Sequence, residues 1–193
     1  FVFTGAPPTV AVGDRVQVSG RAFEFRPGCT VGANAANCAA DSSAFNNLTT
    51  TEIIQPVVTT IGSGNPLPDP VLIGAGGRPS PAVVIAPNVE GSVESPTYPS
   101  DPLRHGLDFF EGLEGMRVAV QGAVAVGPTN KYGEIPVAAD NGVGASLRTF
   151  RGGLVLRQDD FNPERVMLDA RLIGGMPQVK VGDRLGGVIG VMD

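Results

Sequence analysis

The sequence predicts an all-β fold with one short helix, and three observations support this class. Gly and Pro account for 27 and 17 of the 193 residues without a three-residue period, which is typical of many turns between short strands. Apolar and polar residues alternate over several short stretches, as in half-buried strands. One stretch has apolar residues at helical spacing. The 42% hydrophobic content is enough for one domain core and part of a second.

The first two strands are predicted from β-branched and aromatic residues. Alternating apolar residues run through residues 10–25, with a bend expected at Gly20, and long bent strands are typical of small barrels. A turn is expected at Gly13 and Asp14, because glycine accepts positive φ and an Asp side chain accepts a hydrogen bond from a nearby backbone N–H. Residues 52–61 are rich in Ile, Val and Thr and predict the second strand.

Two loop-like segments interrupt the strands. Residues 27–50 form a predicted loop insertion, in which Cys29 and Cys38 are expected to form a disulfide that offsets ordering entropy in an oxidising compartment. Two unrelated buried thiols are the alternative. Residues 62–101 form a predicted Pro/Gly-rich excursion, within which the apolar run at 82–86 is expected to be a strand.

The helix and the last strands of the predicted domain follow. Residues 101–115 have apolar residues three and four apart, with Asp101 expected as the N-cap residue. Two further strands are expected in residues 116–126 and 132–142, and the second ends in an Asn-Gly hairpin signal. A helix between the third and fourth strands is the order of the OB-fold, a five-stranded Greek-key barrel, which we predict for residues 1–148.

The sequence V-G-D-R occurs twice, at residues 12–15 and 181–184. The second copy has one extra residue at Gly186-Gly187, which predicts a bulge. The strand-like segment RVMLD precedes the second copy, much as FVFTG precedes the first. Residues 149–193 are therefore predicted to be a linker and the truncated start of a second OB-like barrel, in an excerpt of a longer protein. The alternative is a turn that unrelated barrels share.

The charge pattern limits the candidate contacts with nucleic acid. The net charge is −5, and the 14 Lys and Arg residues are spread along the chain, which argues against a duplex-binding surface. Weak binding of single strands would need aromatic residues beside basic ones. The candidates are Arg21, Phe23, Phe25, Arg26, Lys131 and Tyr132. The alternative for the two Phe residues is a place in the core.

Acidic residues on the predicted helix are candidate calcium ligands. Asp108, Glu111 and Glu114 are spaced by three and share one helical side, from which they can chelate Ca²⁺ together with Asp101. A solvated acidic face is the alternative. His105 has no second histidine with which to share a metal and is expected to be a surface or packing residue. No apolar run reaches the roughly 18 residues of a membrane span.

Ordered segments of the chain resemble the non-catalytic region of large secreted bacterial nucleases. These segments are FVFTGAPPTVAVGDRVQVSGRAFEF, GSGNPLP, EGMRVAV, NKYGEIPVA, DFNPERVMLD and VGDRLGGVIGVMD. The resemblance implies OB-like domains ahead of a catalytic domain of the endonuclease/exonuclease/phosphatase superfamily. Such a parent protein hydrolyses phosphodiesters outside the cell with Mg²⁺ or a similar divalent ion. The segments at 27–50 and 62–101 depart from the family pattern.

The resemblance implies an accessory role for this chain, at the cell surface or outside the cell. Catalytic domains of that superfamily need two His residues among several acidic ones, and this chain has one His. We therefore expect no catalytic residue and no cofactor here. The expected partners are a catalytic domain of the same polypeptide and, weakly, single-stranded nucleic acid. The alternative function is a structural or adhesive cell-surface repeat protein without catalysis.

Overall fold

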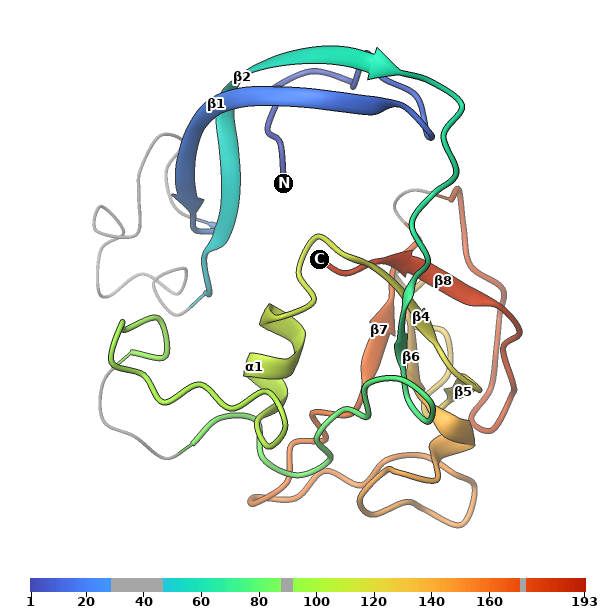
Figure 1. Cartoon of the computed structure of the whole chain (residues 1–193). Coiled ribbons are helices and arrows are strands. Elements are labelled where there is room, and N and C mark those ends of the chain that lie inside the picture. Colours follow the sequence, from blue (N-terminus) through green and yellow to red (C-terminus); the bar gives the residue numbers. More distant parts are fainter. Residues whose placement is uncertain (29–46, 88–91, 171–172) are drawn as a thin grey trace. The chain divides into compact units, whose positions relative to one another are not determined.

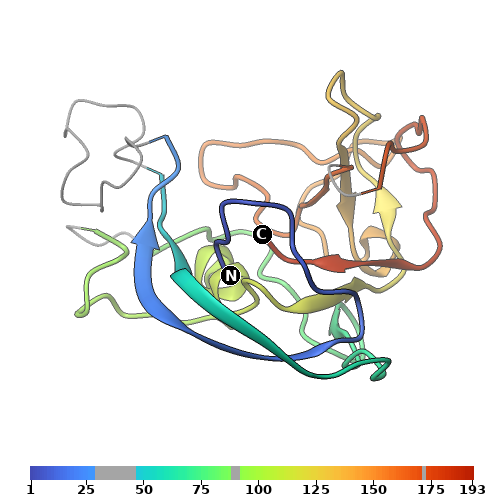
Figure 2. The same cartoon turned by 90° about the horizontal axis from the view of Figure 1, so that it is seen from above.

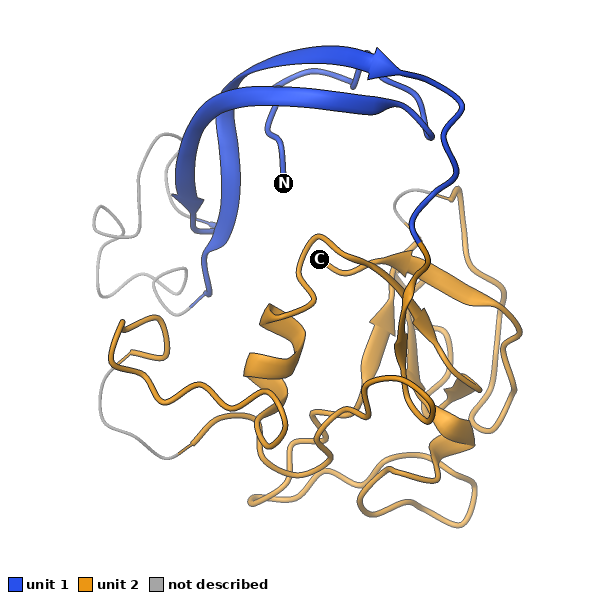
Figure 3. Cartoon of the chain, viewed as in Figure 1, with its two compact units in different colours: residues 1–68 blue, residues 69–193 orange. Residues whose placement is uncertain are grey.

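The computed structural model describes residues 1–28, 47–87, 92–170 and 173–193 (Figure 1). Strands dominate this part of the chain and helix is scarce, so the all-β prediction is confirmed. The chain forms two compact units, Phe1–Pro68 (unit 1) and Asp69–Asp193 (unit 2), as Figure 3 shows. Cys29 and Cys38, the predicted disulfide pair, lie outside the described residues. None of the helices in the described ranges is long and apolar enough to cross a membrane.

Unit 1 is a long ribbon of two antiparallel strands, β1 (Arg15–Phe25) and β2 (Thr50–Gly62), which run side by side (Figures 1 and 2). The pairing register shifts at Gly20, where the sequence predicts a bend. A Cβ atom at Gly20 would lie 2.6 Å from Cγ2 of Ile53, so the close approach of the two strands requires glycine there. The predicted curvature of the first strand thus has a steric origin.

The first residues add a short segment to this ribbon. The N–H of Phe3 donates to the carbonyl of Ile53, and the N–H of Ile53 donates to the carbonyl of Phe1, both at 2.9 Å. This pairing agrees with the strand expected at FVFTG. Apolar side chains of the ribbon stay exposed, with Val57 at 65% and Ile61 at 54%.

Unit 2 contains two three-stranded sheets. Its strands are β3 (Val71–Ile73), β4 (Arg117–Val120), β5 (Val124–Ala125), β6 (Ile135–Ala138), β7 (Val166–Leu168) and β8 (Val188–Val191). One sheet has the order β3-β4-β8, in which β3 is parallel and β8 antiparallel to β4. The other is antiparallel, in the order β5-β6-β7. No sheet of the described residues closes, so the five-stranded barrel predicted for residues 1–148 is not confirmed.

A pair of bent strands links the two sheets of unit 2. Residues 182–191 run antiparallel to residues 117–125, first bridging to β5 and then pairing with β4. Gly122 interrupts one strand at a φ of 52°, and Gly187 interrupts the other at a φ of 65°. The irregularity predicted at Gly186-Gly187 is therefore the point at which the chain passes from one sheet to the other.

The structure divides the chain into its two compact units between Pro68 and Asp69. The domain boundary expected between residues 148 and 149 stays a prediction. Residues 149–193, expected to begin a second barrel, supply β7 and β8 to unit 2. There they pair with β6 and β4, because those strands offer open edges within the same unit. The sequence repeat identified the second turn, but it did not show that the strand after this turn, β8, pairs with β4.

The helix of unit 2, α1 (Gly106–Glu111), lies within residues 101–115 as predicted but is shorter. His105 is its N-cap residue. Asp101, the expected N-cap, begins the preceding turn instead, in which its carbonyl accepts hydrogen bonds from the N–H groups of Arg104 and His105. The N-cap prediction was therefore wrong by one helical turn.

The apolar run at residues 82–86 is not the strand that the sequence predicts. Its carbonyls instead cap the first turn of α1. The N–H of Gly106 donates to Val84, and that of Leu107 donates to Ile85, both at 2.9 Å. These N–H groups have no partner within the helix, so the carbonyls of this bent segment satisfy them.

The core of unit 2 consists of buried side chains from α1 and the strands. Phe109 of α1 packs with Ile73 of β3 and Val118 of β4. A second cluster comes from β4 through β7 and the turn between β4 and β5. Its buried members are Val120, Ala123, Ala125, Ile135, Val137 and Val166.

A short 3-10 helix, η3 (Asp140–Gly142), follows β6. The sequence predicts a hairpin at Asn141-Gly142, but β6 pairs with β5 before it and with the distant β7. Asp140 and Asn141 both have positive φ, 54° and 55°. Asp and Asn tolerate this conformation better than other side chains, so the sequence signal marked the backbone bend correctly but not the connection.

Candidate functional site

The first V-G-D-R copy forms a closed turn before β1. The N–H of Asp14 donates to the carbonyl of Ala11 at 3.0 Å, and Oδ2 of Asp14 accepts the N–H of Ala11 at 2.9 Å. Gly13 has a φ of 94°, which disfavours any residue with a Cβ. Hydrogen bonds from Ala11 and then Ser63 hold the pKa of Asp14 below its ordinary value, since they favour the ionised form.

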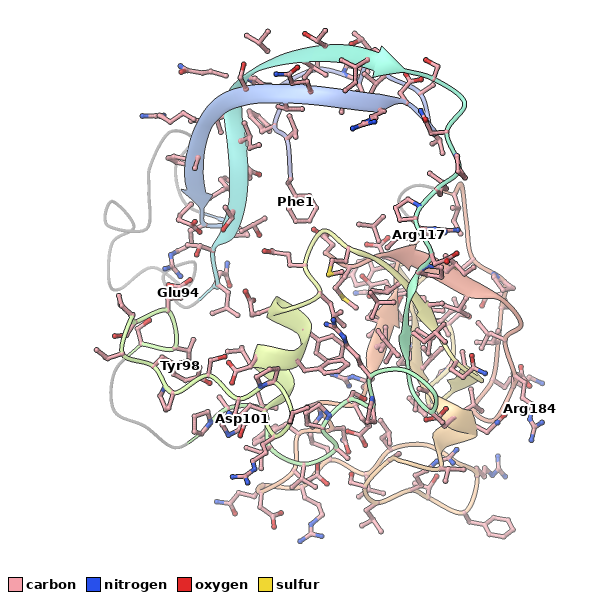
Figure 4. All side chains as sticks on the ribbon, viewed as in Figure 1. Phe1, Glu94, Tyr98, Asp101, Arg117 and Arg184 are labelled. Carbon is pink, nitrogen blue, oxygen red and sulfur yellow. The ribbon has the colours of Figure 1, made fainter. Side chains whose placement is uncertain are left out.

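The second copy forms the same turn. The N–H of Asp183 donates to the carbonyl of Lys180 at 3.1 Å, and Oδ2 of Asp183 accepts the N–H of Lys180 at 2.8 Å. Gly182 has a φ of 92°. Arg15 and Arg184, which follow the two turns, are exposed, and Figure 4 labels Arg184. The turn conformation predicted from Gly and Asp is confirmed. The two V-G-D-R copies therefore share a backbone conformation as well as a sequence.

The predicted nucleic-acid contacts of unit 1 lie at the end of β1. The guanidinium of Arg21 lies 5.9 Å from the ring centroid of Phe23, within the range of a cation–π contact. Phe23 and Phe25 are half-buried. Arg26 is only 6% exposed and donates to the carbonyl of Asn47. Its guanidinium therefore stabilises unit 1 and is poorly accessible to an external phosphate.

Lys131 and Tyr132, the predicted contacts of unit 2, lie in the loop before β6. Nζ of Lys131 is 4.8 Å from the ring centroid of Tyr132, whose side chain is 72% exposed. The Oδ1 atom of Asn130 accepts the N–H groups of Tyr132 and Glu134 at 2.9 and 3.0 Å, which fixes the loop. An exposed aromatic ring on a fixed loop can stack with a nucleic-acid base.

Asp108 is the centre of a buried polar cluster at the start of α1. It is 7% exposed, and its Oδ2 atom accepts the N–H of Asp101 at 2.7 Å and contacts Nδ1 of His105 at 3.0 Å. Figure 4 labels Tyr98 and Asp101 on the segment that leads into the helix. Burial, followed by the negative charge of Asp108, raises the pKa of Tyr98. The cluster fixes the segment before α1.

The four candidate calcium ligands have different surroundings. Asp108 is buried in hydrogen bonds, Glu111 is exposed and Glu114 is half-buried. Asp101 pairs with Arg104, whose Nε lies 3.6 Å from Oδ2. Within the described ranges, no three His, Cys, Asp or Glu side chains form a group that could hold a metal ion. Calcium binding at the helix stays a prediction.

A small pocket with a cavity volume of about 40 Å³, partly open to solvent, lies beside β6 and η3. It brings together the turn after β3, the end of β6, and residues near β7. The lining residues are Gly74, Pro79, Ser80, Ala138, Ala139, Asp140, Gly144, Ala145 and Glu164. Two of them, Asp140 and Glu164, are acidic.

Glu164 is the more deeply buried of the two acids, with 4% exposure. Its Oε1 atom accepts the backbone N–H of Ser146 at 3.1 Å and the hydroxyl of Ser146 at 3.3 Å. Its Oε2 atom is buried and has no hydrogen-bond partner among the described residues. One half of this carboxylate is therefore held in place, and the other half is unsatisfied.

Asp140 approaches the pocket from η3. Both of its carboxylate oxygens accept the N–H of Ala75, at 2.9 and 2.8 Å. Gly74 lies against this carboxylate, since a Cβ atom at Gly74 would be 2.7 Å from Oδ1 of Asp140. No sequence pattern predicts this pair, because the two acids are far apart in the chain and neither stands in a local metal or catalytic motif.

Unit 2 matches a known protein family. Residues 72–193 match the model of a family described as a domain of unknown function, DUF8508. The match covers more than half of the chain and nearly all of unit 2. No curated protein and no solved structure matches the chain.

Proposed function

We propose that this chain, which belongs to the DUF8508 family, is an accessory module of an extracellular, metal-dependent nuclease. In this proposal the module is OB-fold-like and contributes no catalytic residue. It acts as a spacer for a catalytic domain elsewhere in the same polypeptide, or weakly guides nucleic acid to that domain. The catalytic domain uses Mg²⁺ or a similar ion. The ordered segments that resemble the non-catalytic region of secreted bacterial nucleases support this role.

The repeated turn is the observation that carries the proposal. Gly13 and Gly182 have nearly the same φ, 94° and 92°, and Asp14 and Asp183 close the turn through equivalent hydrogen bonds. Each turn leads into a segment that pairs in a sheet, β1 or β8. Recurrence of this turn before a paired segment in each of the two units supports a protein built of β-modules, as expected for a spacer region.

The OB-like barrel is the finer part of the proposal. In small barrels, strands bend at glycines or bulges so that one strand belongs to two sheets in succession. Residues 117–125 and 182–191 bend in this way at Gly122 and Gly187. This supports a barrel-like arrangement, although no sheet closes within the described residues.

Weak guidance of single strands is supported by the aromatic and basic pairs at Arg21-Phe23 and Lys131-Tyr132. Titration of the chain into labelled single-stranded DNA at low salt tests this part. Stacking is worth about 1–3 kcal/mol per base, so Tyr132→Ala is expected to weaken binding by roughly fivefold or more, whereas Tyr132→Phe retains it. Absence of binding at tens of micromolar protein leaves only the spacer role.

The nuclease part of the proposal is tested on the full-length protein. Cleavage of DNA or RNA that EDTA abolishes is the expected result, since the parent activity depends on a divalent ion. Absence of cleavage, or cleavage unaffected by EDTA, contradicts the proposal.

A structural or adhesive cell-surface role is the second candidate. The same repeated turn favours it, because stacked β-modules also build scaffolds, and the ribbon of unit 1 exposes apolar residues such as Val57 and Ile61. The sequence that follows residue 193 in the full-length protein separates the two functions. Further β-modules with no segment rich in His, Asp, Asn and Glu favour the scaffold.

A further inference from the structure

We propose that the pocket beside β6 and η3 binds a divalent cation, Ca²⁺, through Glu164 and Asp140. This inference is independent of the proposed function, because it depends only on side chains within unit 2. It also differs from the calcium site predicted on the helix, which involves other carboxylates.

The buried carboxylate of Glu164 has hydrogen-bond partners for only one of its two oxygens. A buried carboxylate is stable only when it is paired, coordinated to a metal, or fully hydrogen-bonded. Ser146 satisfies Oε1, whereas Oε2 has no hydrogen-bond partner among the described residues. None of the ion pairs seen in the described ranges includes Glu164. A cation in the pocket would neutralise this charge.

Asp140 lines the same pocket. Its carboxylate is held by the N–H of Ala75, and it has no ion pair with a Lys, Arg or His of the described residues. Two carboxylates that line one small pocket repel each other, and a shared cation removes that repulsion. The rigid attachment of each carboxylate, to Ser146 or to Ala75, keeps both in place for a ligand.

The donors of the pocket indicate which cation it binds. The side-chain donors are the carboxylates of Asp140 and Glu164 and the hydroxyl of Ser80, and the lining contains neither His nor Cys. Oxygen donors alone select a hard cation such as Ca²⁺ or Mg²⁺. Ca²⁺ accepts irregular sets of carboxylate, hydroxyl, carbonyl and water oxygens, whereas Mg²⁺ needs a near-ideal octahedron. An irregular pocket with two carboxylates therefore fits Ca²⁺ with an affinity in the range of about 0.1–1 mM.

The test is thermal unfolding of the whole chain, freed of metal, with and without 10 mM CaCl₂. At a Kd of about 1 mM, this concentration raises the folding equilibrium constant about 11-fold. That change corresponds to a rise of roughly 3–6 °C in Tm for a chain of this size. An equal concentration of MgCl₂ is expected to give a smaller rise. Calorimetric titration of Ca²⁺ into the folded chain measures binding without reference to stability.

Conservative variants locate the site. Glu164→Gln and Asp140→Asn are expected to lose the Ca²⁺-dependent rise in Tm. Without Ca²⁺, Glu164→Gln is expected to unfold at the same temperature as the original chain or higher, because it removes an uncompensated buried charge. Asp159→Asn removes one exposed acid, whose carboxylate pairs with Arg157, and is expected to keep the full rise.

Four outcomes would overturn the proposal. The first is no effect of Ca²⁺ on Tm and no heat of binding. The second is an unchanged Ca²⁺ effect in both Glu164→Gln and Asp140→Asn. The third is loss of the effect only in a Glu111→Gln/Glu114→Gln variant, which would place the ion on α1. The fourth is stabilisation by methylammonium chloride but not by Ca²⁺, which would identify an amine as the ligand.

Discussion

Replacing Asp108 with Ala is expected to lower the free energy of unfolding by about 3 kcal/mol, because two partners lose a charged acceptor. The N–H of Asp101 donates to Asp108 at 2.7 Å, and Nδ1 of His105 lies 3.0 Å from the same oxygen. A hydrogen bond to a charged group contributes about 1.5–3 kcal/mol, and relief of the buried charge offsets part of the loss.

The side-chain exposures support a large effect. The Asp108 and His105 side chains are 4% and 14% exposed, so solvent replaces the lost contacts poorly. Asp108→Asn keeps one carbonyl acceptor and is expected to lose about 1–2 kcal/mol. The cluster also fixes the segment from Tyr98 to His105 that precedes α1, so part of the loss is local unfolding of that segment.

Urea unfolding followed by circular dichroism measures these differences. Asp159→Ala is the matched control, because its carboxylate pairs with Arg157 at 3.2 Å while 72% exposed, and exposed pairs contribute about 0–1 kcal/mol. A loss for Asp108→Ala no larger than the loss for Asp159→Ala would refute the reasoning. An Asp108→Asn variant as unstable as Asp108→Ala would show that the charge, and not the acceptor geometry, dominates.

Three further predictions concern the turns and the titration of Asp14 and Tyr98. Gly13→Ala and Gly182→Ala place a Cβ on a residue with positive φ, so each is expected to lower the free energy of unfolding by about 1 kcal/mol, as measured by urea unfolding. Gly144→Ala is the control, because Gly144 is in open space without positive φ, and it is expected to change this free energy little. Because the pKa of Asp14 is lowered in the folded state, its carboxylate stabilises the fold above about pH 4, and this stabilisation is lost as the pH falls further. When the free energy of unfolding is measured against pH, Asp14→Asn is expected to lack this loss at acid pH. The raised pKa of Tyr98 favours its neutral form when folded, so its contribution is present below about pH 10 and lost at higher pH; Tyr98→Phe is expected to lessen the alkaline loss, and an unchanged alkaline titration would contradict this.

Local features of the fold could be predicted from the sequence. The Gly13-Asp14 turn depends on two adjacent residues, so its conformation and its side-chain hydrogen bond follow from residue type. The bend at Gly20 was likewise visible as a glycine within an alternating strand, and the structure adds the close contact with Ile53 that requires it. The sequence also located α1, since the spacing of its apolar residues is a local property.

Features that depend on distant partners could not be predicted in the same way. Residues 82–86 are apolar and include β-branched residues, but carbonyls of this segment cap α1, and no local pattern indicates a helix end as its partner. β8 belongs to unit 2, where it pairs with β4, and the sequence repeat did not indicate that pairing.

The candidate site shows the same limit. The exposure of Tyr132 agrees with its choice as a stacking candidate, whereas the burial of Arg26 was unexpected for a charged residue at a strand end. Asp140 and Glu164 have ordinary local contexts, and only the three-dimensional fold brings them to one pocket. Their significance comes from Oε2 of Glu164, which is buried without a hydrogen-bond partner among the described residues, and this is a property of packing and not of residue type.

A paired nuclease assay tests the central claim most directly. The full-length protein and the 193-residue chain are compared on the same single- and double-stranded substrates, each with Mg²⁺ and with EDTA. We predict cleavage by the full-length protein that EDTA abolishes, and no cleavage by the chain alone. Cleavage by the chain alone, or a full-length protein that cuts nothing, would contradict the account of an accessory module in a metal-dependent nuclease.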